Sequence, residues 1–147
     1  MMLAHELWEQ FTRKYNVNET SYGTWAFGVD GNQLAELVLQ GIKTATSSAY
    51  IFYELEEEPL PKVGQYHIIL NDKEEATCVI QITKVSILPF EQVTEEHAYK
   101  EGEGDRTLDY WKKVHQAFFT EELRQVNMQF QEDMKVVCEE FKVLLKA

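Results

Sequence analysis

The chain has 147 residues, with 14 Lys and Arg against 25 Asp and Glu, which gives a formal net charge of −11. Hydrophobic residues make up 44% of it and aromatic residues 12%, which is enough for one buried core and excludes a disordered or collagen-like chain. The acidic excess also disfavours binding along a phosphate backbone, because that binding requires a positively charged face.

The sequence contains no segment typical of membrane insertion or secretion. No apolar run reaches the roughly 18 residues of a spanning helix, and residues 1–6 lack the basic and apolar regions of a signal peptide. We therefore expect a cytoplasmic protein with no membrane partner. Cys78 and Cys138 lie far apart and in no metal-binding pattern, so we expect them to be small buried side chains.

Helical spacing of apolar residues predicts a first helix over Leu3–Tyr15, with one face against the core. A short aromatic stretch follows at residues 25–28. The next helix is expected from its N-cap Asp30 to Gln40, with Gly41 as its C-cap. Its buried stripe is predicted to be Leu34, Leu37 and Val38.

The middle of the chain has the pattern of extended structure. Residues 43–50 are rich in Thr, Ser and Ala, which suits a strand, and residues 55–60 form an acidic segment. Residues 66–70 and 76–87 are predicted to be two strands joined by a hairpin turn at residues 71–74.

The last third is predicted to contain two helices and a strand. A short helix begins after the N-cap Thr94, and a long helix covers residues 107–124. The closing strand covers residues 135–145, with an imperfect alternation at Val137, Glu139, Phe141, Val143 and Leu145. Strands with peripheral helices, but without regular strand–helix alternation, predict an α+β fold with a small curved sheet or barrel.

We expect a single domain over residues 1–147. In this division residues 1–24 form the N-terminal helix and its lead-in, and residues 25–147 form the barrel core with its helices.

The segment Gly41–Ser48 combines a lysine with several hydroxyls. In an extended strand Lys43 and Thr46 point to opposite faces, so they meet only if a turn or bulge follows the glycine. If they meet, a partly desolvated lysine can activate the Thr46 hydroxyl as a nucleophile. The alternative is a surface lysine that precedes a β-prone run.

The segment Glu101–Asp105 carries three carboxylates separated by glycines that permit sharp turns. Asp105 is also suited to the N-terminus of the following helix. No further oxygen ligands for a hard cation are identifiable, so we expect neither a metal nor a cofactor.

Aromatic side chains near these two segments could stack on a base, although most aromatic residues belong to a core. They are Trp25, Phe27, Tyr50, Tyr110 and Trp111, of which Trp111 has the helical spacing of a core residue. His97 and His115 have no evident Ser, Cys or Asp partner, so we expect them to be structural or hydrogen-bonding histidines.

Several segments, in this order, carry a family resemblance. They are Trp25–Gly28, Leu34–Val38, Gly41–Thr46, Pro59–Gly64, Pro89–Phe90, and Glu101–Arg106 followed by Tyr110–Trp111, His115 and Phe118–Phe119. On these residues the chain resembles the ASCH family, and within it a larger bacterial branch; these domains are homologous to a transcription coactivator and have a fold like the PUA RNA-binding domain. The resemblance implies a small PUA-like β-barrel with peripheral helices and a cleft lined by the Gly-x-Lys-x-x-Thr segment.

In the compact bacterial branch of this superfamily the activity is hydrolysis of the acetyl amide of 4-N-acetylcytidine. The resemblance implies that Lys43 is the base, Thr46 the nucleophile and Glu101 the proton donor. Ser48 stands where the compact branch has an arginine. The residues that we expect to contact the ligand are Trp25, Phe27, Thr44, Ser48, Glu103 and Asp105.

Two other functions compete with this hydrolase hypothesis. A PUA-like fold can be an RNA-binding module, and a ribonuclease could use the same cleft. Both need to attract phosphate, whereas the basic residues are scattered along this acidic chain. We therefore expect a small nucleoside or modified base as the partner rather than an RNA polymer.

Overall fold

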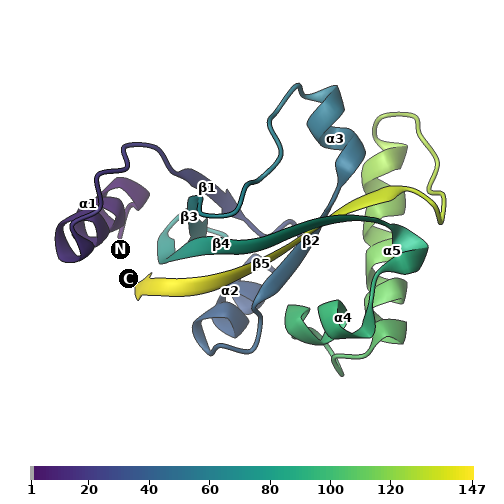
Figure 1. Ribbon diagram of the computed structural model, residues 1–147. Coiled ribbons are helices and arrows are strands. Elements are labelled where there is room, and N and C mark those ends of the chain that lie inside the picture. Colours follow the sequence, from purple (N-terminus) through teal and green to yellow (C-terminus); the bar gives the residue numbers. More distant parts are fainter. Residues whose placement is uncertain (1) are drawn as a thin grey trace.

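In the residues that a computed structural model describes, 2–147, five α-helices and one short 3-10 helix surround a five-stranded sheet (Figure 1). The elements in chain order are α1 (Ala4–Tyr15), β1 (Gly23–Ala26), α2 (Gly31–Leu39), β2 (Ala45–Ala49), α3 (Tyr50–Leu55), β3 (Tyr66–Leu70), β4 (Ala76–Pro89), η1 (Phe90–Gln92), α4 (Glu95–Glu101), α5 (Leu108–Arg124) and β5 (Lys135–Lys146). The α+β prediction is confirmed. Within these residues, no helix combines the length and the apolar character needed to cross a membrane.

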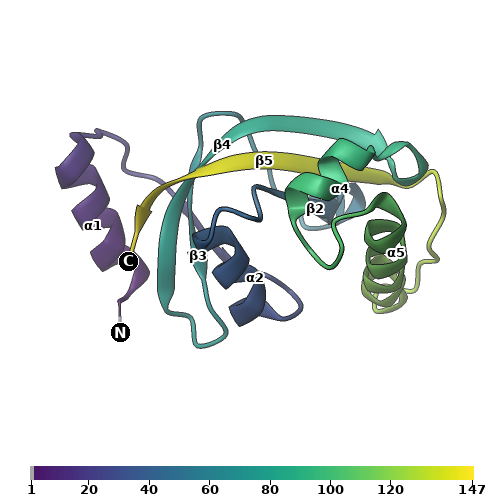
Figure 2. The same cartoon turned by 90° about the horizontal axis from the view of Figure 1, so that it is seen from below.

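The sheet has the order β1-β3-β4-β5-β2, in which β1 pairs parallel with β3 and all other pairs are antiparallel. Its long strands β4 and β5 form a curved ribbon that runs the length of the molecule, and the sheet curls into a half-barrel (Figure 2). Register shifts in this ribbon, at Val79/Ile80 and Ile82/Lys84, bend the strands as β-bulges do.

Helix α1 covers one end of the sheet (Figure 1). Its residues Leu7, Trp8 and Phe11 are buried against Ile68 of β3 and Val79 of β4. The amphipathic pattern therefore predicted the helix and the middle of its buried face correctly, whereas Leu3 and Tyr15 at the two ends of the apolar stripe are exposed.

Helices α4 and α5 lie at the opposite end of the molecule. Both begin as predicted, because Thr94 accepts a hydrogen bond from the His97 backbone and Thr107 accepts one from the Tyr110 backbone. Trp111 and Phe119 of α5 pack with Phe90 in a separate core cluster, so Trp111 is a core residue as expected.

One local prediction is wrong, and one helix was not predicted. The buried face of α2 is formed by Gly31, Ala35 and Val38, whereas Leu34 and Leu37 are only partly buried. Residues 50–55 form helix α3, directly after the segment predicted to be extended, and the sequence pattern did not predict this helix. A six-residue helix is too short to produce a clear helical period, and its aromatic and β-branched residues resemble a strand.

Candidate functional site

An open cleft of about 1860 Å³ is lined by residues of β1, β2, α3 and α5. Lys43, Thr46, Ser47, Glu101 and Glu103 line it together. The structure therefore brings the three catalytic candidates, Lys43, Thr46 and Glu101, to one cavity, although Glu101 is 58 positions from Lys43 in sequence.

The end of α2 positions Lys43. Gly41 adopts a positive φ of 77°, and the backbone N–H groups of Gly41 and Ile42 bond to Val38 and Leu37, which is a Schellman motif. Gly41 thus ends α2 as predicted. The chain turns here and β2 begins only at Ala45, so strand alternation does not fix the direction of the Lys43 side chain.

The Lys43 ammonium is buried and surrounded by three oxygens. Its Nζ donates to Glu101 Oε1 at 3.2 Å, to the Glu101 carbonyl at 3.3 Å and to Glu103 Oε2 at 2.8 Å. It also lies 5.2 Å from the centre of the Phe27 ring. Three acceptors match the three N–H donors of an ammonium, so this arrangement leaves no lone pair on the nitrogen.

Glu101 accepts hydrogen bonds from several elements at once. Its Oε2 accepts from Trp111 Nε1 at 2.6 Å, from His97 Nε2 at 2.8 Å and from the Ser47 hydroxyl. Its Oε1 lies 3.4 Å from His115 Nε2. Burial opposes ionisation of this carboxyl, but the Lys43 charge and the bonds from the two histidines outweigh it and hold the pKa of Glu101 well below its usual value.

Both histidines contact this carboxylate, as the hydrogen-bonding interpretation allows, but the expectation that they lack a serine partner is wrong. His97 Nε2 lies 2.8 Å from the Ser47 hydroxyl. Burial lowers the pKa of His115 and the contact with Glu101 more than restores it, so its net shift is upward. The sequence did contain a signal for this arrangement. His97 and Glu101 are four positions apart, as are Trp111 and His115, so each pair lies on one face of its helix.

Two glycines shape the acidic loop after α4. Gly102 has a φ of 71°, and a Cβ there would clash with the backbone of Ile42. Gly104 has a φ of 58°, and a Cβ there would clash with the Tyr110 ring. The loop can therefore fold back closely enough for Glu101 and Glu103 both to reach Lys43, as glycine-dependent turns allow.

A different set of polar groups occupies the other face of β2. Thr46 lies directly opposite Glu139 of β5 in the antiparallel ladder, so these side chains share a face. The Ser48 hydroxyl lies 2.9 Å from the Tyr53 hydroxyl of α3. Glu139 is only 7% exposed and lines the cleft, and burial raises its pKa to about 7.

The remaining ligand-contact candidates divide into two groups. Trp25 and Phe27 line the cleft with their rings edge-to-face at 5.0 Å. Thr44 instead donates to the Lys100 carbonyl and borders a smaller hollow. Asp105 is exposed and accepts hydrogen bonds from Thr107 at the start of α5, so neither Thr44 nor Asp105 lines the cleft.

Glu101, Glu103 and His115 also offer ligand atoms within 4.8 Å of one another, which is close enough to hold a cation. Lys43 Nζ already lies between the two carboxylates. A metal ion at this position would have to compete with the ammonium for the same oxygens.

A sequence profile of the ASCH domain matches residues 23–145. The chain belongs to the ASCH domain family. This ASCH domain is similar in structure to a protein from Enterococcus faecalis V583, with 41% identity and a TM-score of 0.90 over 97% of this chain and 88% of that one. It is also similar to an ASCH domain from Lactobacillus crispatus JV V101, with 35% identity and a TM-score of 0.88 over 95% and 92% of the two chains.

The PUA-like fold expected from the motifs is confirmed for this ASCH domain. A hypothetical protein with 16% identity and a TM-score of 0.58, over 84% of this chain and all of that one, supports the fold alone. The comparison with curated proteins gave no match.

The cleft of this ASCH domain is strongly acidic. Its acidic lining residues are Glu19, Asp30, Glu56, Glu58, Glu101, Glu103, Glu121, Glu122 and Glu139, whereas its lysines are Lys43 and Lys62. Because Glu101 and Glu103 already share the charge of Lys43, the charged side chains that line the cleft sum to a negative charge.

Proposed function

We propose that this ASCH domain is an amidohydrolase that removes an acyl group from the exocyclic amine of a nucleoside-sized ligand, with 4-N-acetylcytidine as the representative substrate. The observation that carries the proposal is that one cleft contains both the Thr46 hydroxyl and the buried Lys43 ammonium. Hydrolysis of an amide through a covalent intermediate needs these two groups, a nucleophile and a cation that stabilises the negative charge on the carbonyl oxygen.

The contacts favour roles for Lys43 and Glu101 that differ from those implied by the family resemblance. A general base needs a free lone pair, and the three acceptors around Lys43 Nζ favour the ammonium form. Glu101 is held as a carboxylate, which cannot donate a proton. In this scheme Glu101 fixes Lys43 in place, and the Lys43 ammonium stabilises the oxyanion that forms after Thr46 attacks.

The surroundings of Lys43 suit an uncharged base. The rings of Trp25, Phe27 and Tyr110 supply apolar surface for stacking. Glu103 is the more exposed of the two carboxylates on Lys43, with 17% side-chain exposure, so a substrate oxygen can take its place on the ammonium at the lower desolvation cost.

The test is release of acetate and cytidine from 4-N-acetylcytidine, followed by chromatography. We expect Thr46→Ala to lower kcat/KM at least 100-fold and Thr46→Ser to retain measurable turnover, because only the serine variant keeps a hydroxyl. Thr83→Ala, at an exposed position of β4, is the matched control, and its kcat/KM should equal that of the wild type. Unchanged turnover in Thr46→Ala would remove the assignment.

RNA binding is the second candidate, and the size of the cleft favours it. Its volume of about 1860 Å³ exceeds the roughly 300–1,000 Å³ of ordinary small-molecule pockets, so it has room for more than one nucleoside. Electrophoretic mobility at moderate and high salt separates the two functions. Tight RNA binding with a steep salt dependence would favour the RNA-binding module, and degradation of a generic RNA that is lost in Lys43→Ala would favour a ribonuclease.

A further inference from the structure

Glu139 is a buried acidic residue that lines the cleft. It is 7% exposed, and among residues 2–147 no side chain donates a hydrogen bond or forms an ion pair with its carboxyl group. Burial of such a group is unfavourable unless a partner compensates it. A compensating donor therefore has to come from what the carboxyl group faces, which is the cleft and the residue opposite it.

The residue opposite Glu139 is the proposed nucleophile. Thr46 and Glu139 are direct partners in the β2–β5 ladder, and such pairs have Cβ atoms about 4.5–5.5 Å apart on the same face of the sheet. Both residues line the cleft. Among residues 2–147 neither the Thr46 hydroxyl nor the Glu139 carboxyl group has a side-chain hydrogen-bond partner, and the two groups do not bond to each other, so both are free to contact a substrate in the cleft.

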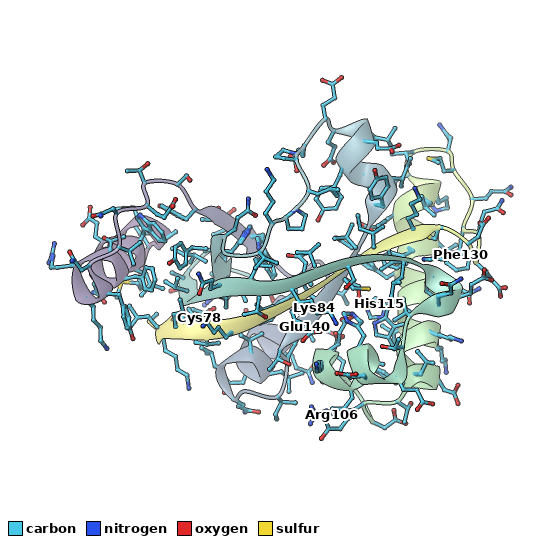
Figure 3. All side chains as sticks on the ribbon, viewed as in Figure 1. Cys78, Lys84, Arg106, His115, Phe130 and Glu140 are labelled. Carbon is cyan, nitrogen blue, oxygen red and sulfur yellow. The ribbon has the colours of Figure 1, made fainter. Side chains whose placement is uncertain are left out.

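The next residue along the strand, Glu140, has a different environment from Glu139. It faces the other side of β5, where its carboxylate bonds to Lys100 at 3.0 Å and lies 3.7 Å from Lys84 (Figure 3). Position 139 therefore differs from its neighbour in burial, in the absence of a cation and in facing Thr46.

We propose that Glu139 is a catalytic residue, the proton acceptor for the Thr46 hydroxyl. The inference rests on the proposed hydrolase function and assigns to Glu139 the role that the family resemblance gives to Lys43. Lys43 then acts only through its positive charge.

The proton balance closes with water as the co-reactant. As Thr46 Oγ1 forms a bond to the acyl carbon, its proton moves to the Glu139 carboxylate. When the carbon–nitrogen bond breaks, Glu139 returns that proton to the leaving amine, and an acyl ester remains on Thr46. Water then attacks the ester, gives a proton to Glu139, and the proton returns to Thr46 Oγ1 as the carboxylic acid leaves.

The electrostatic surroundings of Glu139 support this role. Desolvation raises its pKa to about 7, which makes the carboxylate a stronger base than an exposed one and still available at neutral pH. The titratable group that faces it from α3 is Tyr53, whose own pKa is raised by burial. Its neighbours across the strand on β2, Thr46 and Ser48, do not titrate in this range.

The experiment measures kcat/KM for 4-N-acetylcytidine between pH 5 and 9 in the wild type, Glu139→Gln and Glu140→Gln. We expect Glu139→Gln to lose about 100-fold to 10,000-fold in rate, because a positioned base contributes that much. The wild-type rate should fall at acidic pH with a midpoint near 7, and the glutamine variant should lack this step. Glu140→Gln should stay within about twofold of the wild type.

Circular dichroism and thermal unfolding establish whether Glu139→Gln folds. If it does not, the wild-type profile decides, together with partial rescue of Glu139→Ala by added formate, which can enter the vacated space. The role of Glu139 is overturned by a wild-type profile without a step near pH 7, or by a folded Glu139→Gln variant with wild-type turnover. In either case, loss of activity in Thr46→Ala would still support the hydrolase. No turnover by the wild type overturns both proposals.

Discussion

Glu101 and Glu139 are both buried glutamates of one cleft, but their environments are opposite. Glu101 is 1% exposed and accepts bonds from Lys43, His97, Trp111 and Ser47, and these partners keep it ionised despite its burial. Glu139 is 7% exposed and has no such partner among residues 2–147, and burial raises its pKa to about 7. Charged and hydrogen-bonding partners, rather than burial itself, therefore decide which of the two groups can exchange a proton near neutral pH.

The two faces of β2 produce this separation. Ser47 faces α4 and joins the Glu101 network, whereas Thr46 and Ser48 face Glu139 and Tyr53. Because successive residues of a strand point to opposite sides, one short strand contributes to both environments. In the proposed mechanism, Glu101 holds Lys43 as an ammonium on one face of β2, and Glu139 accepts and returns the Thr46 proton on the other.

The largest effect on stability is expected from removing the negative charge of Glu101. Glu101→Gln should lower the free energy of unfolding by about 3–5 kcal/mol at pH 7, because it removes the charge that compensates buried Lys43 and the acceptor of several donors. Urea unfolding measures the change. Glu96→Gln, which is exposed on the same helix, is the control, and a loss below about 1 kcal/mol in Glu101→Gln would show that the network is not stabilised as described.

Ionisation of Glu139, unlike that of Glu101, should destabilise the fold. An unfolded glutamate ionises near 4.5 and Glu139 only near 7, so its ionisation destabilises the fold increasingly as pH rises between these values. Relative to the wild type, the free energy of unfolding of Glu139→Gln should rise by on the order of 3 kcal/mol between pH 4 and pH 8, because the Glu139 carboxyl group ionises near pH 7 in the folded protein and near 4.5 in the unfolded one. Chemical unfolding at both pH values measures it, and parallel pH dependence of the two proteins would contradict the assignment.

A smaller effect is expected from the neutral contact on the same side of β2. Tyr53→Phe removes one hydroxyl–hydroxyl bond to Ser48 and should cost about 0.5–1.5 kcal/mol in unfolding free energy. Tyr99→Phe, on the exposed side of α4, is the matched control and should change stability by less than about 0.5 kcal/mol. Equal effects from the two substitutions would mean that the Ser48–Tyr53 bond contributes nothing measurable.

Much of the fold could be predicted because it depends on local signals. The apolar period of α1, the glycine that ends α2 and the threonines that begin α4 and α5 are all visible within a few residues. Helix α3 was missed because its six residues are too few for a helical period to appear.

The site could be predicted only in part, because its contacts join distant segments. The motifs located Lys43 and Glu101, but the link between Ser47 and His97 depends on how β2 meets α4. Glu139 carried a signal of its own, since it occupies an inward position of an alternating strand between Val137 and Phe141. From the sequence alone, a single charged residue in such a pattern is interpreted as an irregular strand position. The pairing with Thr46 becomes visible only in the folded structure.

Carbon-13 NMR of the glutamate side-chain carboxyl groups, assigned with Glu139→Gln and recorded from pH 4 to pH 9, tests the contrast between Glu101 and Glu139 most directly. We expect the Glu139 signal to titrate with a midpoint near 7 and the Glu101 signal to remain that of a carboxylate throughout. A Glu139 carboxyl group that is already ionised at pH 5 would contradict the account.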